Sequence, residues 1–141
     1  MASYLIVANQ TLPSALLRDA VQERRAAGDA TFYVVVPATK AGRNFTWDED
    51  ESRRQARERL DAYLASLEAE GISATGEVGD SDPIEAVRDA IRGRDVDEIL
   101  LSTLPPGISR WIGQDVPSRL RGVVTTPVTV IHQPAETVAG R

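Results

Sequence analysis

The sequence contains no cysteine and only one histidine. Without cysteine, the chain cannot form disulfides, thiolate metal sites or a cysteine nucleophile. One histidine is too few for a histidine-rich zinc site. Aromatic residues make up 5% of the chain, which is little for a surface that stacks nucleic-acid bases. We therefore expect neither thiol chemistry nor a metal site.

The charge balance argues against a polyanionic partner. The chain carries 16 basic and 21 acidic residues, for a net charge of −5, whereas nucleic-acid-binding domains are generally basic. No apolar run approaches the ~18 residues of a membrane helix. The amino-terminal residues lack the basic start of a secretory signal. These features predict a cytoplasmic protein that binds neither nucleic acid nor membranes.

The length of 141 residues, with 42% hydrophobic and 26% charged residues, is that of one ordinary globular domain. We expect residues 1–133 to form this domain. Residues 134–141 are predicted to form a flexible carboxyl-terminal tail, because the sequence turns polar after the last apolar run.

Short apolar runs alternate with segments of helical spacing along the chain. The runs predict five strands, at residues 4–8, 32–36, 72–78, 96–102 and 128–131. Four helices are expected between them, and Asp82 followed by Pro83 is typical of a helix start. Alternating units of this kind require parallel strands with right-handed crossovers. The sequence therefore predicts an α/β fold, a doubly wound, Rossmann-like parallel sheet with helices on both faces.

Ligands of such sheets bind beyond the carboxyl ends of the strands, where the strand order reverses. Polar residues follow three of the predicted strands, at 9–11, 37–39 and 102–107. Their side chains and backbone groups could hold a small ligand by hydrogen bonds. Each segment also has a purely structural interpretation, as a turn into a helix or a stiff, proline-rich connection.

Other polar residues give weaker signals. Arg110, Arg119 and Arg121 could contact an anionic ligand, although ordinary surface charge is the favoured interpretation. His132 follows the last predicted strand, but the chain has no Gly-x-Ser-x-Gly nucleophile elbow. No catalytic residue is therefore assigned, and an enzymatic role, such as a hydrolase using Ser102 and His132, ranks last.

Several motifs make the chain resemble the universal stress protein family over nearly its whole length. The matching features are the opening Leu-Ile-Val-Ala at 5–8, Gly79 with Pro83, and the carboxyl-terminal module from Asp97 through Gly113 to Val128. The resemblance implies a sheet in the order 3-2-1-4-5. It also implies a homodimer formed through the last strand, at Val128 and Val130, and an adenine nucleotide such as ATP or AMP as a ligand.

The nucleotide-binding motif of that family is interrupted here. Its members carry Gly-x-x-Gly, nine residues, then Gly-Ser or Gly-Thr, so that backbone N–H groups approach phosphates. Ser102 and Pro105 stand at the two first glycine positions, seven residues then precede Gly113, and Gln114 replaces the hydroxyl residue. Proline also lacks the N–H that the motif uses. The interrupted motif argues against ATP binding in the usual mode.

Two functions remain open from the sequence. The first is a ligand-binding or regulatory module with its site at the carboxyl edge of the sheet. The second is a dimeric scaffold or interaction protein of the same fold with a vestigial nucleotide cleft. The candidate ligand-binding residues are Asn9, where the family usually places an aspartate, with Gln10, Thr39, Ser102, Thr103, Gly107 and Gly113.

Overall fold

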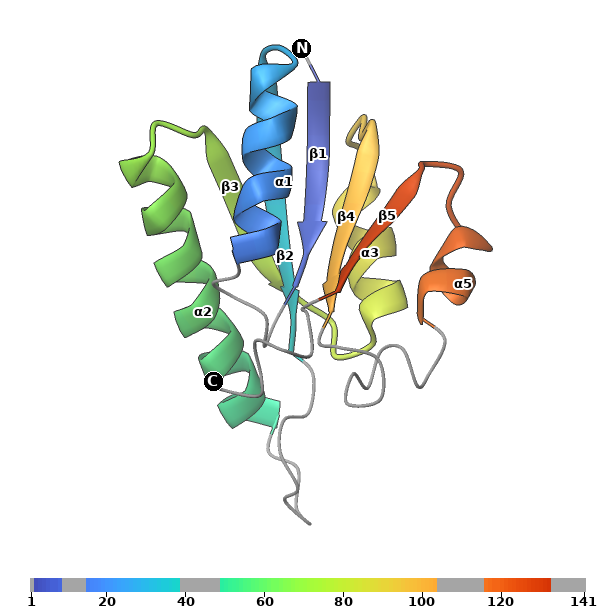
Figure 1. Cartoon of the computed structure of the whole chain (residues 1–141). Coiled ribbons are helices and arrows are strands. Elements are labelled where there is room, and N and C mark those ends of the chain that lie inside the picture. Colours follow the sequence, from blue (N-terminus) through green and yellow to red (C-terminus); the bar gives the residue numbers. More distant parts are fainter. Residues whose placement is uncertain (1, 9–14, 39–48, 104–115, 133–141) are drawn as a thin grey trace, which may run out of the picture.

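The computed structural model describes residues 2–8, 15–38, 49–103 and 116–132. Strands and helices alternate along these residues (Figure 1). In chain order they are β1 (Ala2–Val7), α1 (Ala15–Ala26), β2 (Ala30–Pro37), α2 (Glu49–Ala69), β3 (Ala74–Gly79), α3 (Pro83–Ile91), β4 (Glu98–Thr103), α5 (Val116–Arg121) and β5 (Val128–His132). In the described ranges, no helix is both long and apolar enough to cross a membrane.

The five strands form one parallel sheet in the order β3-β2-β1-β4-β5. The predicted fold class and strand order are therefore confirmed. β1 lies at the centre, between β2 and β4, and β3 and β5 form the two edges. All carboxyl ends lie along the lower edge of the sheet in the view of Figure 1.

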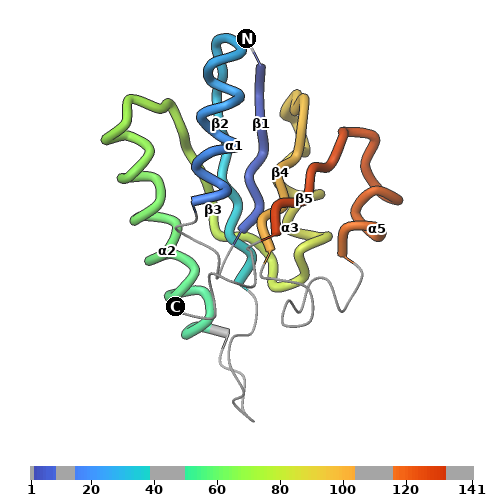
Figure 2. The backbone as a smooth tube through the Cα atoms, viewed as in Figure 1, coloured from blue at the N-terminus to red at the C-terminus, as the bar shows by residue number. Residues whose placement is uncertain are grey.

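Helices cover both faces of the sheet (Figure 2). The side chains of α1 and α2 pack with one set of strand residues, and those of α3 and α5 pack with the other. On β1, Ile6 belongs to the first cluster, and Leu5 and Val7 belong to the second. All three are fully buried, and each contributes roughly 1.5–3 kcal/mol of apolar burial. Burial on both faces explains why β1 is a continuous apolar run rather than an alternating one.

The end of α2 corrects one predicted boundary. The apolar pattern places residues 72–73 in the third strand, but β3 begins at Ala74. Gly71 has a φ of +76°, and its N–H donates to the Glu68 carbonyl over 2.9 Å. The Ile72 N–H donates to the Leu67 carbonyl, also over 2.9 Å. This pairing is a Schellman helix end, so Ile72 packs with α2 instead of extending the sheet.

The other boundaries shift by a few residues. The fourth strand begins at Glu98 rather than residue 96, and it extends to Thr103. The predicted start of α3 is confirmed: the Asp82 carboxylate accepts from the Ile84 N–H over 2.9 Å, and Pro83 occupies the first turn. The cap supplies an acceptor for a backbone donor that the helix itself cannot pair.

Candidate functional site

The carboxyl edge of the sheet contains the point where the strand order reverses. β1 and β4 are neighbours, with Val7 opposite Leu101. From β1 the chain continues to β2 on one side, whereas from β4 it continues to β5 on the other. Connections that leave two neighbouring strands in opposite directions open a crevice at the strand ends. This edge is therefore the first place to look for a ligand site.

Two of the sequence-predicted residues end β4 at this edge. Ser102 and Thr103 are both buried, with exposed fractions of 0% and 1%. Successive residues of a strand point to opposite faces, so the two hydroxyl side chains lie on different faces of the sheet. Ser102 follows Leu100 on the α1–α2 side, and Thr103 follows Leu101 on the α3–α5 side.

Thr103 lies beside the only histidine of the chain. The two residues are opposite each other in the β4–β5 register, and Thr103 Oγ1 lies 2.9 Å from His132 Nδ1. His132 is an exposed residue, whereas Thr103 is buried. Sequence reasoning missed this pair, since it considered His132 only with Ser102. The signal was present, because the strand order places the ends of β4 and β5 side by side.

The remaining candidate residues lie outside the described residues. These are Asn9, Gln10, Thr39, Gly107 and Gly113, together with Arg110. The predicted tail at 134–141 lies outside them as well. Among the residues that the structure does describe, no group of three or more His, Asp or Glu side chains could hold a metal ion.

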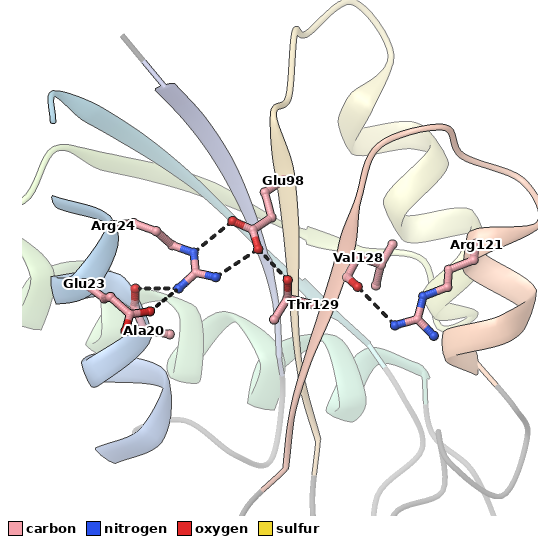
Figure 3. Close-up of polar contacts among 7 residues, drawn as sticks. All are labelled: Ala20, Glu23, Arg24, Glu98, Arg121, Val128 and Thr129. Carbon is pink, nitrogen blue, oxygen red and sulfur yellow. Dashed lines mark hydrogen bonds and ion pairs between the residues drawn. The ribbon is translucent and has the colours of Figure 1, made fainter. Parts of the chain in front are cut away.

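β5 forms one edge of the sheet. Val128 and Val130, the predicted dimer residues, are half-buried and pack against the α3–α5 cluster. The Ile99 N–H donates to the Pro127 carbonyl over 2.8 Å. Because successive carbonyls of a strand alternate in direction, the Val128 carbonyl faces away from β4. Arg121 Nη2 donates to this outward carbonyl over 3.0 Å (Figure 3).

An ion pair holds the opposite, amino-terminal end of β4 (Figure 3). Arg24 of α1 donates from Nε and Nη2 to the two carboxylate oxygens of Glu98, over 2.9 Å each. Thr129 of β5 also donates to Glu98. The bond from Arg24 is the main reason that the pKa of Glu98 is lowered from 4.5. This network ties α1 and the edge strand to β4, far from the carboxyl edge.

A second polar cluster lies on β2 and β3. The Tyr33 hydroxyl donates to Glu77 over 2.5 Å, and the Arg94 guanidinium lies 3.8 Å from the centre of the Tyr33 ring. Burial, followed by the bond to Glu77, raises the pKa of Tyr33 to about 12. Tyr33 packs against the α3–α5 cluster, so these polar contacts lie beside that cluster.

An open groove of about 450 Å³ lies elsewhere, along α2 and the amino end of β3. Its lining combines apolar side chains with the carboxylates of Asp61 and Glu68. The groove lies at the other end of β3 from the carboxyl edge. It therefore does not contribute to the site at the strand ends.

Comparison with known proteins places this geometry in a fold class. No protein-family model matches the chain, and no curated protein matches it. Among solved structures, a protein of the universal stress protein family from Burkholderia pseudomallei is 19% identical, with a TM-score of 0.64 over 92% of this chain and 95% of that one. A universal stress protein from Archaeoglobus fulgidus is 21% identical, with a TM-score of 0.64 over 93% of each chain.

A third solved structure carries a ligand. It is a universal stress protein family protein from Arabidopsis thaliana with AMP bound, 10% identical, with a TM-score of 0.64 over 97% of this chain and 95% of that one. The three likenesses span almost the entire length of each chain. The chain therefore has the universal stress protein fold, as its sequence resemblance implied.

Proposed function

We propose that this chain is a universal stress protein-like module that binds a small ligand at the carboxyl edge of its sheet. The reversal of strand order between β1 and β4 carries the proposal, because ligands of doubly wound sheets bind at this point. The candidate contacts are Asn9, Gln10, Thr39, Ser102, Thr103, Gly107 and Gly113.

An adenine nucleotide is the ligand class to test first. A solved structure of the same fold holds AMP. Pro105 removes a backbone donor, and Gln114 replaces the hydroxyl residue of the phosphate-binding motif. With fewer donors for a phosphate chain, the site favours the single phosphate of AMP over the triphosphate of ATP.

Isothermal titration calorimetry with AMP, ADP and ATP tests the proposal directly. We expect heat of binding with AMP, and weaker or absent binding of ATP. Thr39→Ala should weaken the AMP signal. Thr125→Ala makes the same chemical change at an exposed position before β5 and should leave binding intact. Absence of heat with all three nucleotides at millimolar concentration would refute a nucleotide ligand.

The alternative is a dimeric scaffold with a vestigial cleft. It is supported by the edge position of β5 and by the partial exposure of Val128 and Val130, because an edge strand can pair with another chain. Sedimentation across micromolar concentrations should then show a dimer that Val130→Asp dissociates. Val123→Asp, at a surface valine that is 48% exposed, serves as the matched control. A monomeric wild-type protein would eliminate this function.

A further inference from the structure

We propose that His132 contacts the ligand of the carboxyl edge through Nε2, donating to a phosphate oxygen, and that Thr103 positions its ring. This inference rests on the proposed function, since it names a further residue of the same site. It assigns a role to a pair that the sequence motifs do not include.

The two residues are placed by neighbouring strands. Thr103 ends β4 and His132 ends β5, directly opposite in the register. The backbone pairing of β4 with the edge strand β5 fixes where both side chains begin. The Thr103 hydroxyl, buried with the rest of its side chain, lies 2.9 Å from Nδ1 of His132. One ring nitrogen therefore contacts Thr103, and the residue that carries the other ring nitrogen is exposed.

The burial of Thr103 selects the direction of this hydrogen bond. A buried hydroxyl hydrogen without an acceptor is costly, and the neutral Nδ1 nitrogen supplies an acceptor. When Thr103 donates to Nδ1, the hydrogen of the neutral ring resides on Nε2. Fixing one ring nitrogen in this way determines the tautomer and the orientation of the other. His132 then presents an N–H donor at the carboxyl edge.

The Nε2–H donor of His132 at the carboxyl edge is suited to a hydrogen bond with an anionic oxygen. Hydrogen bonds to charged acceptors are stronger than those between neutral groups. The family motif supplies phosphate donors from backbone N–H groups, and Pro105 lacks one of them. A side-chain donor on the adjacent strand would replace part of that loss. The ligand group expected at Nε2 is therefore the phosphate of a nucleoside monophosphate.

The single histidine makes a spectroscopic test direct. In protein labelled with ¹⁵N at histidine, long-range proton–nitrogen correlations report only the two ring nitrogens of His132. The measurement is made at mildly alkaline pH. We expect the pattern of a ring protonated at Nε2. AMP and inorganic phosphate should shift the Nε2 signal, and adenosine should leave it in place.

The outcomes separate this inference from the proposed function. If calorimetry shows AMP binding while the ring signals stay fixed, the role of His132 is wrong and the proposed function stands. Equal shifts with adenosine and AMP would contradict the phosphate contact. If no nucleotide binds and phosphate has no effect, both the nucleotide ligand and the role of His132 are refuted.

Variants test the two roles in turn. His132→Ala should weaken AMP binding about tenfold, the loss expected for one hydrogen bond to a charged group. His132→Gln, whose amide can reach the same acceptor, should lose less. Thr103→Val should change the tautomer pattern of the ring and weaken AMP binding. Thr125→Val, a matched change at an exposed site, should change neither, and unaltered tautomers in Thr103→Val would overturn the positioning role.

Discussion

Replacing Glu98 with glutamine should destabilise the protein by about 1.5 kcal/mol at neutral pH. The change removes the charge that pairs with Arg24 while keeping the shape of the side chain. The side chains of Arg24 and Glu98 are only 17% and 20% exposed. Exposed ion pairs contribute about 0–1 kcal/mol, whereas breaking a fully buried pair costs about 3–5 kcal/mol. The Arg24–Glu98 pair is partly buried, so the free-energy cost of breaking it should lie between these limits. The amide of glutamine can still accept one hydrogen bond, which reduces the cost.

The effect should also depend on pH. Because the Arg24 guanidinium lowers the pKa of Glu98 from 4.5 in the folded protein, the unfolded chain takes up this proton first as the solution is acidified. The stabilisation is therefore complete above the unfolded pKa and is lost as the pH falls through the lower, folded pKa. The gap in stability between wild type and Glu98→Gln should narrow as the pH falls from neutrality to about 3.

Urea unfolding of a double-mutant cycle measures this interaction. The cycle combines Glu98→Gln with Arg24→Met, and we expect a coupling free energy of about 1–1.5 kcal/mol. The control is Asp61→Asn, which breaks an exposed pair with Arg57 at 3.6 Å and should change stability by less than about 0.5 kcal/mol. A coupling energy near zero, or a stability gap that does not vary with pH, would refute the reasoning.

Three further predictions concern single residues. Gly76→Ala should destabilise the protein by about 3 kcal/mol in urea unfolding, because the new methyl would lie 2.3 Å from the Val34 carbonyl oxygen; Gly122→Ala, with nothing closer than 3.4 Å, should be nearly neutral. Asp82→Ala should cost about 1 kcal/mol in thermal or urea unfolding through the lost helix cap, and Asp82→Asn much less. The pKa of Tyr33, raised to about 12, should fall in Glu77→Gln when tyrosinate absorbance is titrated. Stability linked to this phenol is complete below about pH 10, the ordinary tyrosine value, and is lost as the pH rises towards 12.

Local sequence was sufficient to predict the strands and helices and their succession along the chain, whereas the order of the strands in the sheet came from the family resemblance. The apolar run at the start of the chain predicted a strand covered on both faces, and the structure buries Leu5 and Ile6 against different helices. The order 3-2-1-4-5 implied by the family resemblance put the third strand at an edge, which β3 occupies. The predicted start of β3 was wrong because an apolar residue that follows a helix can either begin a strand or pack at the end of the helix. The local sequence is the same in both cases. Only the hydrogen bonds of Gly71 and Ile72 distinguish the two.

Contacts between residues that are far apart in the sequence could not be predicted from local sequence. Arg24 and Glu98 are 74 positions apart, and each alone resembles an ordinary surface charge. Thr103 and His132 meet because of the β4–β5 register, which depends on the whole sheet rather than on either segment. Of the candidate ligand residues, only Ser102 and Thr103 belong to the part of the chain that the structure describes. The others remain predictions.

The central position of β1 has a consequence for synthesis of the chain. β1 is made before its partner β2, which follows soon after. Its other partner, β4, which pairs with it from Tyr4 opposite Glu98, is made much later. A nascent chain that ends before β4 contains β1, β2 and β3 with α1, α2 and α3, and it therefore holds most residues of the first cluster. Leu5, Val7 and Val35 still lack Ile99 and Leu101 on the other face. An incomplete chain thus leaves the β4 side of β1 unpaired and the second cluster only partly covered, by α3, and binding of a hydrophobic dye to residues 1–97 would report it.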